Sequence, residues 1–194
     1  MSQNVMWTAF RRPNAPAPAA AAPLAPFDAA SRGAWSWEQP ARLRPHWNLT
    51  VDDAVVGTLA LRGLLRRAAD VRVAAGGWSL RPRFPNDVLV LFDGAGTPCV
   101  RYRPGWLRGG RIEREGRETL FLRCENFWGT RWAIQTVERL PLVHLHHRLG
   151  PFMVRNSATL ELEDAARRLE DLPVLMALAW FEMLRARRSH AAHG

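Results

Sequence analysis

Residues 172–184 have the sequence LPVLMALAWFEML, which is apolar on every face of a helix except at Glu182. Asp171 is suited to cap the start of this helix, and Pro173 is tolerated within its first turn. A helix without a polar face must be buried in protein or in lipid. These thirteen residues span only about 20 Å, short of the roughly 30 Å hydrocarbon core, and Glu182 disfavours a membrane span further. The segment therefore predicts a helix that the protein itself encloses.

The helix is predicted to extend beyond this apolar segment, from about residue 164 to about residue 188, and residues 189–194 are predicted to fray. A helix buried on all sides contributes most of its side chains to the core. The predicted core side chains are Leu172, Leu175, Met176, Leu178, Ala179, Trp180, Phe181 and Leu184. Such a helix needs an enclosure, which the preceding residues must supply.

Residues 35–162 consist of short alternating runs interrupted by glycine, proline and aspartate, a pattern typical of β-strands. A motif recurs within them as LALRGLLR from Leu59, VRYRPGWLR from Val100 and VHLHHRL from Val143. These starting points are 41 and 43 residues apart, and Leu80-Arg81 precedes Leu122-Arg123 by 42 residues. Two alignments with one period indicate an internal repeat.

Each repeat contains four predicted strands, separated by turn signals such as Asp52-Asp53 and Gly109-Gly110. The predicted strands lie near residues 35–39, 47–51, 56–62, 68–74, 78–82, 88–92, 98–103, 110–115, 119–124, 131–137, 141–147 and 153–162. Twelve strands about 4.8 Å apart and tilted by about 40° would close into a barrel whose bore, roughly 12 Å wide, matches a helix. The sequence therefore predicts a mainly β fold: a closed antiparallel barrel of about twelve strands, in three four-strand repeats, around a buried hydrophobic C-terminal helix.

Residues 1–34 are rich in proline and alanine and predict a disordered tail, so the barrel and its helix are assigned to residues 35–188. The first residues lack the apolar stretch of a signal peptide. Two cysteines, Cys99 and Cys124, are too few for a disulfide framework. These features favour a reduced, cytoplasmic environment.

Arginine supplies all 27 basic residues, against 18 acidic residues, and lysine is absent. This composition excludes a phosphate-binding-loop lysine and a Schiff-base lysine. Motifs of serine hydrolases, zinc proteases, dinucleotide-binding loops and calcium loops do not occur. His144 and His146 share one strand face, where they belong either to a polar outer surface or to a metal site that lacks a third local ligand. We predict no catalytic residues, no metal and no cofactor.

Successive turns of such a barrel open on opposite ends, so strand parity sorts the charged residues. One end is predicted to be basic and to include the end of the helix, whereas the other carries Asp52, Asp53, Asp93, Glu115, Glu118 and Glu138. The candidates for binding an anion or a membrane are Arg66, Arg67, Arg81, Arg83, Trp106, Arg108, Arg148, Arg185, Arg187 and Arg188. Apolar residues at 64–65, 106–107, 149 and 152 lie at the same end, where they either contact a partner or fold inward to close the barrel.

Three phrases resemble bacterial members of the tubby C-terminal-domain superfamily, which includes phospholipid scramblases and the LURP-one-related proteins: GTLALRGL at 57–64, Asn126-Phe127-Trp128 and LPVLMALAWF at 172–181. The resemblance covers about residues 35–188 and lies in a pattern of strands followed by an apolar helix. It implies a closed barrel around a central helix, no catalysis and, for some members, binding of anionic phospholipid. The phosphoinositide site of tubby uses lysine, which this chain lacks, so no binding residue carries over. The acidic calcium segment and the cysteine-rich patch of scramblases do not occur either.

The charge pattern and the resemblance together predict a non-enzymatic binding or scaffold module at the cytoplasmic face of the inner membrane. Its basic end would engage an anionic phospholipid surface or an acidic protein, because clustered arginines attract both. The alternatives are a nucleic-acid-binding protein that uses arginine and tryptophan and, less favoured, a pocket protein or an unrecognised enzyme. We expect a monomer without a transmembrane span.

Overall fold

The computed structural model describes residues 23–41, 44–63, 66–83, 88–105, 108–149 and 156–191. Within these ranges the chain forms twelve strands, a 3-10 turn at Ala166–Arg168 and the helix α1 at Leu172–Ala191. The strands are β1 Trp35–Glu38, β2 His46–Val51, β3 Ala54–Arg62, β4 Ala68–Val73, β5 Gly76–Arg83, β6 Val88–Phe92, β7 Pro98–Pro104, β8 Gly109–Arg114, β9 Leu120–Cys124, β10 Arg131–Gln135, β11 Pro141–Leu149 and β12 Asn156–Leu162. Every one of them overlaps a predicted strand.

The strands form one closed barrel in which each strand is antiparallel to both neighbours. Strands that follow one another in the chain are paired, and β1 closes the ring against β12 with Trp35 opposite Leu160 and Trp37 opposite Ala158. Closure leaves no sheet edge with unpaired backbone groups. The prediction of a mainly β fold, with a closed antiparallel barrel of about twelve strands and a C-terminal helix, is confirmed.

Three register shifts bend the wall of the barrel. They lie between neighbouring residues of β2, β6 and β10, at Leu49/Thr50, Leu91/Phe92 and Ile134/Gln135. An extra residue in one strand increases the local twist and curvature, which helps a sheet to close. The shifts are 42 and 43 residues apart, close to the 41 and 43 residues that separate the copies of the sequence motif.

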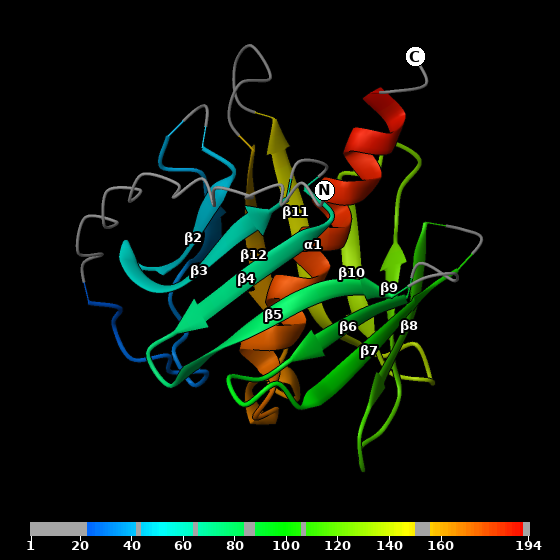
Figure 1. The fold of residues 1–194 in the computed structure, drawn as a ribbon, viewed down its shortest axis with the longest axis horizontal. Helices are drawn as coiled ribbons and strands as arrows, with labels where there is room; N and C mark the ends of the chain where they lie inside the picture. The colour runs from blue at the N-terminus through cyan, green and yellow to red at the C-terminus, as the bar shows by residue number, and fades with distance from the viewer. Residues whose placement is uncertain are drawn as a thin grey trace, which may run out of the picture.

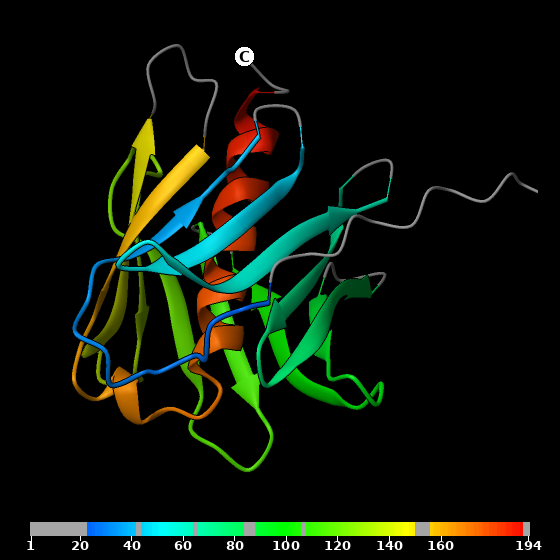
Figure 2. The same ribbon diagram turned by 90° about the vertical axis from the view of Figure 1, so that its left-hand side faces the viewer.

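The helix α1 lies inside the ring of strands, as Figure 1 and the perpendicular view in Figure 2 show. All thirteen residues from Leu172 to Leu184 are buried. Of the eight predicted core side chains, seven have an exposed fraction of 0% and Leu184 has 5%. The indole rings of Trp37 and Trp47 pack against that of Trp180, with ring centroids 6.5 Å and 6.2 Å apart. The wall and the helix therefore share one core.

The helix begins later than predicted, at Leu172 instead of about residue 164. The chain leaves β12 at one end of the barrel and must reverse direction before it can enter the interior, so residues 163–171 form turns and a short 3-10 segment. The carbonyl of Asp171 accepts the amide of Leu175 at 3.0 Å, which starts the α-helical ladder. At its other end α1 continues to Ala191, so residues 189–191, predicted to fray, are helical.

The segment 23–34, predicted to belong to a disordered tail, packs along the barrel. The amide of Ala25 donates to the carbonyl of Val55 at 2.9 Å, and the ring of Phe27 lies 5.2 Å from that of Trp35. Arg167 donates to the carbonyl of Ala29 at 3.2 Å. The folded unit therefore begins before residue 35, and residues 1–22 lie outside the described residues. Single apolar side chains can dock on a finished wall without any periodic pattern, so composition misplaced this boundary.

Candidate functional site

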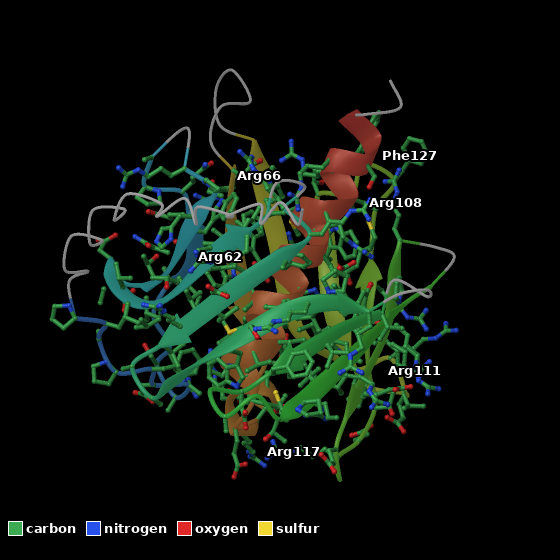
Figure 3. All side chains as sticks on the ribbon, in the orientation of Figure 1. Arg62, Arg66, Arg108, Arg111, Arg117 and Phe127 are labelled. Atoms are coloured by element: carbon green, nitrogen blue, oxygen red, sulfur yellow. The ribbon has the colours of Figure 1, made fainter. Side chains whose placement is uncertain are left out.

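The path of α1 distinguishes the two ends of the barrel. We call the end at which α1 finishes the basic rim; its described residues are 39–41, 44–45, 63, 66–67, 105, 108 and 125–130, with the last turns of α1 from residue 185. The opposite rim consists of residues 23–34, 52–53, 74–75, 93–97, 115–119, 136–140 and 163–171. Figure 3 shows Arg66, Arg108 and Phe127 toward the end of α1, and Arg117 near its start.

The predicted candidates fall into three groups. Arg66 and Arg67 are exposed in the turn between β3 and β4, and Arg148 is exposed near the end of β11. Arg81 and Arg83 lie on the outer face of β5, which ends at Arg83 on the side of the basic rim, and each guanidinium stacks 5.7 Å from the ring centre of Phe92. Arg108, Arg185, Arg187 and Arg188 are half-buried at the basic rim. Trp106 lies outside the described residues, as do residues 64–65, 107 and 152.

Neutral acceptors hold two arginines of α1 at the basic rim. Arg187 donates to Oδ1 of Asn156 at 2.9 Å and to a ring nitrogen of His147. Arg188 donates to the carbonyls of Leu184 and Arg66, at 3.2 Å and 3.1 Å. Because carbonyl, amide and imidazole acceptors carry no charge, these bonds position both guanidinium groups without neutralising them.

The crowding of positive charge shows in the pKa values. Burial, followed by the charges of Arg66 and Arg185, lowers the pKa of Arg188, an effect that Glu182 offsets in part. Burial also lowers the pKa of Arg187. Burial and the charge of Arg187 lower the pKa of His147 to about 4, so this ring is neutral at pH 7. Among the described residues, Arg66 and Arg185 thus place further positive charge around Arg188.

The buried carboxylate of α1 also lies near this rim. Glu182 has an exposed fraction of 4% and forms an ion pair with Arg185 at 3.0 Å. Burial, followed by the charge of Glu182, raises the pKa of the Tyr102 hydroxyl. Glu182 therefore neutralises the charge of Arg185. In this respect Arg185 differs from Arg187 and Arg188, which bond to neutral acceptors.

The turn between β9 and β10 presents two side chains that sequence reasoning did not place at the site. Phe127 and Trp128 are 81% and 79% exposed, and their rings contact each other edge to face at 5.4 Å between centroids. Arg108 donates to the carbonyl of Phe127 at 2.5 Å, and its guanidinium lies 5.9 Å from the centre of the Phe127 ring. An available signal was two adjacent aromatic residues at the centre of an Asn-x-x-Gly turn, where polar residues are usual.

Arginines also cover the outer face of β5–β9, which we call the arginine wall. Its members are Arg81, Arg83, Arg101, Arg103, Arg111 and Arg123, and the five strands contain a single acidic residue, Glu113. Glu113 pairs with Arg103 at 2.9 Å and with Arg111. Hydrogen bonds from Arg111 and then from Arg103 lower the pKa of Glu113, despite its small desolvation. Val90 lies between Arg81 and Arg101 in register and is 3% exposed, although it faces outward.

At the opposite rim, two arginines near the start of α1 pair with carboxylates. Arg114 points inward with a side chain 4% exposed, and it forms an ion pair with Asp171 at 3.2 Å. Its other donors reach the carbonyl of Glu118 at 3.0 Å and 2.8 Å. Arg117 pairs with Asp171 at 3.3 Å and with Glu170 at 2.5 Å. The Asp171 carboxylate thus anchors the start of α1 to the turn between β8 and β9.

A shallow hollow of about 350 Å³ lies on the wall near the opposite rim, lined by residues of β7 and β8 that include Cys99 and Arg114. Burial, followed by the charge of Asp93, raises the pKa of the Cys99 thiol. A protonated thiol is a weak nucleophile. On the outer face of β11, the rings of His144 and His146 are 6.2 Å apart and contact Glu125 and Glu161. The described residues contain no group of three or more histidine, cysteine, aspartate or glutamate side chains arranged to hold a metal ion.

In the described part of the chain, α1 is the sole α-helix, and its apolar stretch is too short for the helix to cross a bilayer. No protein-family model, curated protein or solved structure matches the chain.

Proposed function

We propose that this protein is a non-enzymatic binding module whose basic rim engages an anionic phospholipid surface at the cytoplasmic face of a membrane. The observation that carries the proposal is the way in which the rim holds its arginines. Arg187 and Arg188 bond to neutral acceptors, and Arg66, Arg67 and Arg148 are exposed around them. Each basic residue near an anionic bilayer contributes about 1 kcal/mol of attraction.

The arrangement also explains how positive charge can gather where α1 ends. The last turn of a helix carries a partial negative charge, which basic side chains complement. Arg187 and Arg188 satisfy this local requirement, while the surrounding turns add further arginines from β3–β4, β7–β8 and β11.

We also propose that the chain is a member of the tubby-like superfamily. This proposal rests on the sequence pattern and on a closed barrel around a C-terminal helix.

Sedimentation with lipid vesicles tests the proposal. We expect binding to vesicles that contain phosphatidylserine, little binding to phosphatidylcholine alone, and weaker binding as salt rises, because counterions screen exposed charges within about 8 Å at physiological ionic strength. Replacing Arg66, Arg67 and Arg108 with serine should weaken binding by roughly 100-fold or more, at about 1 kcal/mol for each charge.

The matched control removes the same number of charges from the opposite rim, as Arg32→Ser, Arg117→Ser and Arg139→Ser. All three residues are exposed there. If both triple variants lose affinity equally, net charge and not the basic rim drives binding. Binding that ignores lipid charge would defeat the proposal outright.

Nucleic-acid binding is the second candidate, and the arginine wall is the observation that favours it. Six arginines on four of five adjacent strands share this face with one carboxylate, which suits a phosphate backbone. A gel shift at several salt concentrations should then give a log–log slope that falls by about 2–3 when Arg81, Arg101 and Arg123 become serine. An unchanged slope in this variant would show that the arginine wall does not contact the phosphate backbone.

A further inference from the structure

We propose that Phe127 and Trp128 form an aromatic tip that enters the interfacial layer of an anionic bilayer and anchors the basic rim there. This inference rests on the proposed function and adds the contact that holds the protein on the membrane. It follows from three independent properties of the β9–β10 turn: its rigidity, the exposure of its two rings and the arginines that surround it.

The turn is held in one conformation by its own polar groups. The Asn126 side-chain oxygen accepts the amides of Thr130 and Arg131, at 2.9 Å and 3.1 Å, and its nitrogen donates to Oγ1 of Thr130 at 2.7 Å. The amide of Gly129 bonds to the carbonyl of Asn126 at 3.2 Å, and the indole of Trp132 donates to the carbonyl of Gly129 at 3.0 Å. Gly129 has a φ of 70°, a conformation that glycine adopts without strain.

This rigid turn leaves its two central side chains in solvent. Trp128 is 79% exposed, whereas Trp35, Trp37, Trp47, Trp132 and Trp180 are all 3% exposed or less. Phe127 contacts Trp128 and the guanidinium of Arg108, and it remains 81% exposed. The core buries these five indole rings almost completely and makes no use of the Phe127–Trp128 pair, and two adjacent exposed rings commonly mark a contact site.

The charges around the β9–β10 turn favour an anionic bilayer as its partner. Arg108 is bonded to the turn, Arg131 follows it directly in the chain, and Arg148 lies on β11, whose His147 amide bonds to the carbonyl of Thr130 at 2.8 Å. Glu125, the carboxylate at the start of the turn, is directed to His144 at 3.4 Å. Aromatic rings favour the headgroup layer of a membrane, and the arginines beside them favour its anionic lipids.

The shape of the aromatic tip is compatible with a bilayer as its partner. Two rings at the apex of a turn form a protrusion, which a fluid interface can accommodate without a matching cavity. Stable membrane attachment generally needs two signals, such as an apolar insertion together with a basic patch. The basic rim supplies one of them, and the tip supplies the other.

The opposite rim offers a matched control. Val137 and Leu140 are 56% and 62% exposed in the turn between β10 and β11, next to Glu138 and Arg139. This pair has a similar position in a hairpin turn but lies at the end of the barrel where α1 begins. Substitutions there remove exposed apolar surface without touching the basic rim.

The first test compares F127S/W128S with V137S/L140S in sedimentation with phosphatidylserine vesicles. We expect F127S/W128S to weaken binding roughly 10- to 100-fold, because each ring would lose part of a large buried apolar area. We expect V137S/L140S to bind like the wild type. Thermal unfolding of each variant verifies folding, and both should melt like the wild type because the four side chains are exposed.

The second test asks whether the indole ring of Trp128 enters the bilayer. Bromine on the acyl chains of a vesicle quenches a tryptophan that enters the bilayer. We expect this quenching for the wild type and not for the W128F variant. W128F keeps an aromatic ring and should bind within about 5-fold of the wild type. Loss of the quenching signal with binding retained would identify Trp128 as the inserted residue.

The outcomes separate the two claims. If the wild type fails to bind anionic vesicles, the proposed function is overturned and the inference with it. If the wild type binds, but F127S/W128S binds equally well and W128F is quenched like the wild type, the tip is overturned and the proposed function stands. If F127S/W128S weakens binding to immobilised polyglutamate but not to vesicles, the tip docks on an acidic protein and the bilayer assignment is overturned.

Discussion

The two ends of α1 use arginine in opposite ways. Where the helix begins, Arg114 and Arg117 pair with Asp171 and Glu170, so positive charge is cancelled at the site that holds the helix. Where the helix ends, Arg187 and Arg188 donate to imidazole, amide and carbonyl groups. The same residue type therefore fastens the helix at one end and leaves positive charge at the other.

This difference shows that the charge polarity of the barrel depends on pairing more than on residue counts. Arg185 lies at the basic rim, yet Glu182 neutralises it. Arg117 lies at the opposite rim and shares its charge with two carboxylates. A map of arginine positions in the sequence contains neither pairing. Near the end of α1, Arg187 and Arg188 bond to neutral acceptors and keep their charge, whereas near its start Arg114 and Arg117 pair with carboxylates.

The largest predicted effect comes from breaking the helix that joins the two ends. Leu178 has an exposed fraction of 0%, so Leu178→Asp places an unpaired charge in the core and should cost more than about 5 kcal/mol, enough to unfold the domain. Truncation before Leu172 should have the same result because it empties the barrel. Circular dichroism and thermal unfolding measure both changes.

The control for this substitution is Leu140→Asp. Leu140 is 62% exposed at the opposite rim, so its replacement should change the free energy of unfolding by less than about 0.5 kcal/mol. A Leu178→Asp protein with a cooperative transition near that of the wild type would contradict the burial of α1.

The next effect tests the paired end. Arg114→Met leaves the carboxylate of Asp171 with one fewer partner and removes the bonds to the carbonyl of Glu118, at a cost of about 3–5 kcal/mol. Arg117→Met is the matched variant; its side chain is 41% exposed, so solvent screens its ion pairs and we expect a much smaller loss than for Arg114→Met. Urea unfolding measures both, and equal losses would show that burial does not distinguish the two ion pairs.

A smaller effect tests the neutral acceptors at the basic rim. The folded-state pKa of His147, about 4, lies below the ordinary value of 6.5, so protonation favours the unfolded chain. The stabilisation is complete above pH 6.5 and decreases as pH falls toward 4, by about 2 kcal/mol after allowance for partial solvation. Urea unfolding at pH 7 and pH 4.5 measures this change.

His147→Gln should flatten this part of the pH dependence, since glutamine can still accept from Arg187 but does not titrate. His144→Gln is the comparison variant, because His144 lies on the outer face of β11. If the two variants follow the same pH profile, the neutral state of His147 does not stabilise the basic rim.

Local patterns were sufficient to predict the strands. Alternation between inward and outward residues, with glycine and aspartate at the turns, placed a strand at 98–103 where β7 spans Pro98–Pro104. The period of the repeat and the number of strands in each repeat then predicted a closed barrel, because a barrel of twelve strands leaves room for a helix. The apolar segment predicted the helical core residues because a helix with no polar face needs an enclosure whatever its neighbours are.

Contacts between distant parts of the chain could not be predicted in this way. The start of α1 depends on the reversal at residues 163–171, and Arg114 is 57 residues away from Asp171. The Phe127–Trp128 turn resembles a family motif in sequence, but the hydrogen bonds of Asn126 that hold its two rings in solvent form only in the folded protein. The predicted strand 78–82 stops one residue before β5 ends at Arg83, because the exact end of a strand is a weak signal.

The amino-acid sequence alone determined a strand-rich wall and a helix that has to lie inside it, because hydrophobic periodicity is local and burial of apolar surface dominates folding. The tertiary structure alone decided which arginines are neutralised and which rings stay in solvent. Both depend on distances of a few ångströms between residues such as Arg187 and Asn156, which come together only after the barrel has closed.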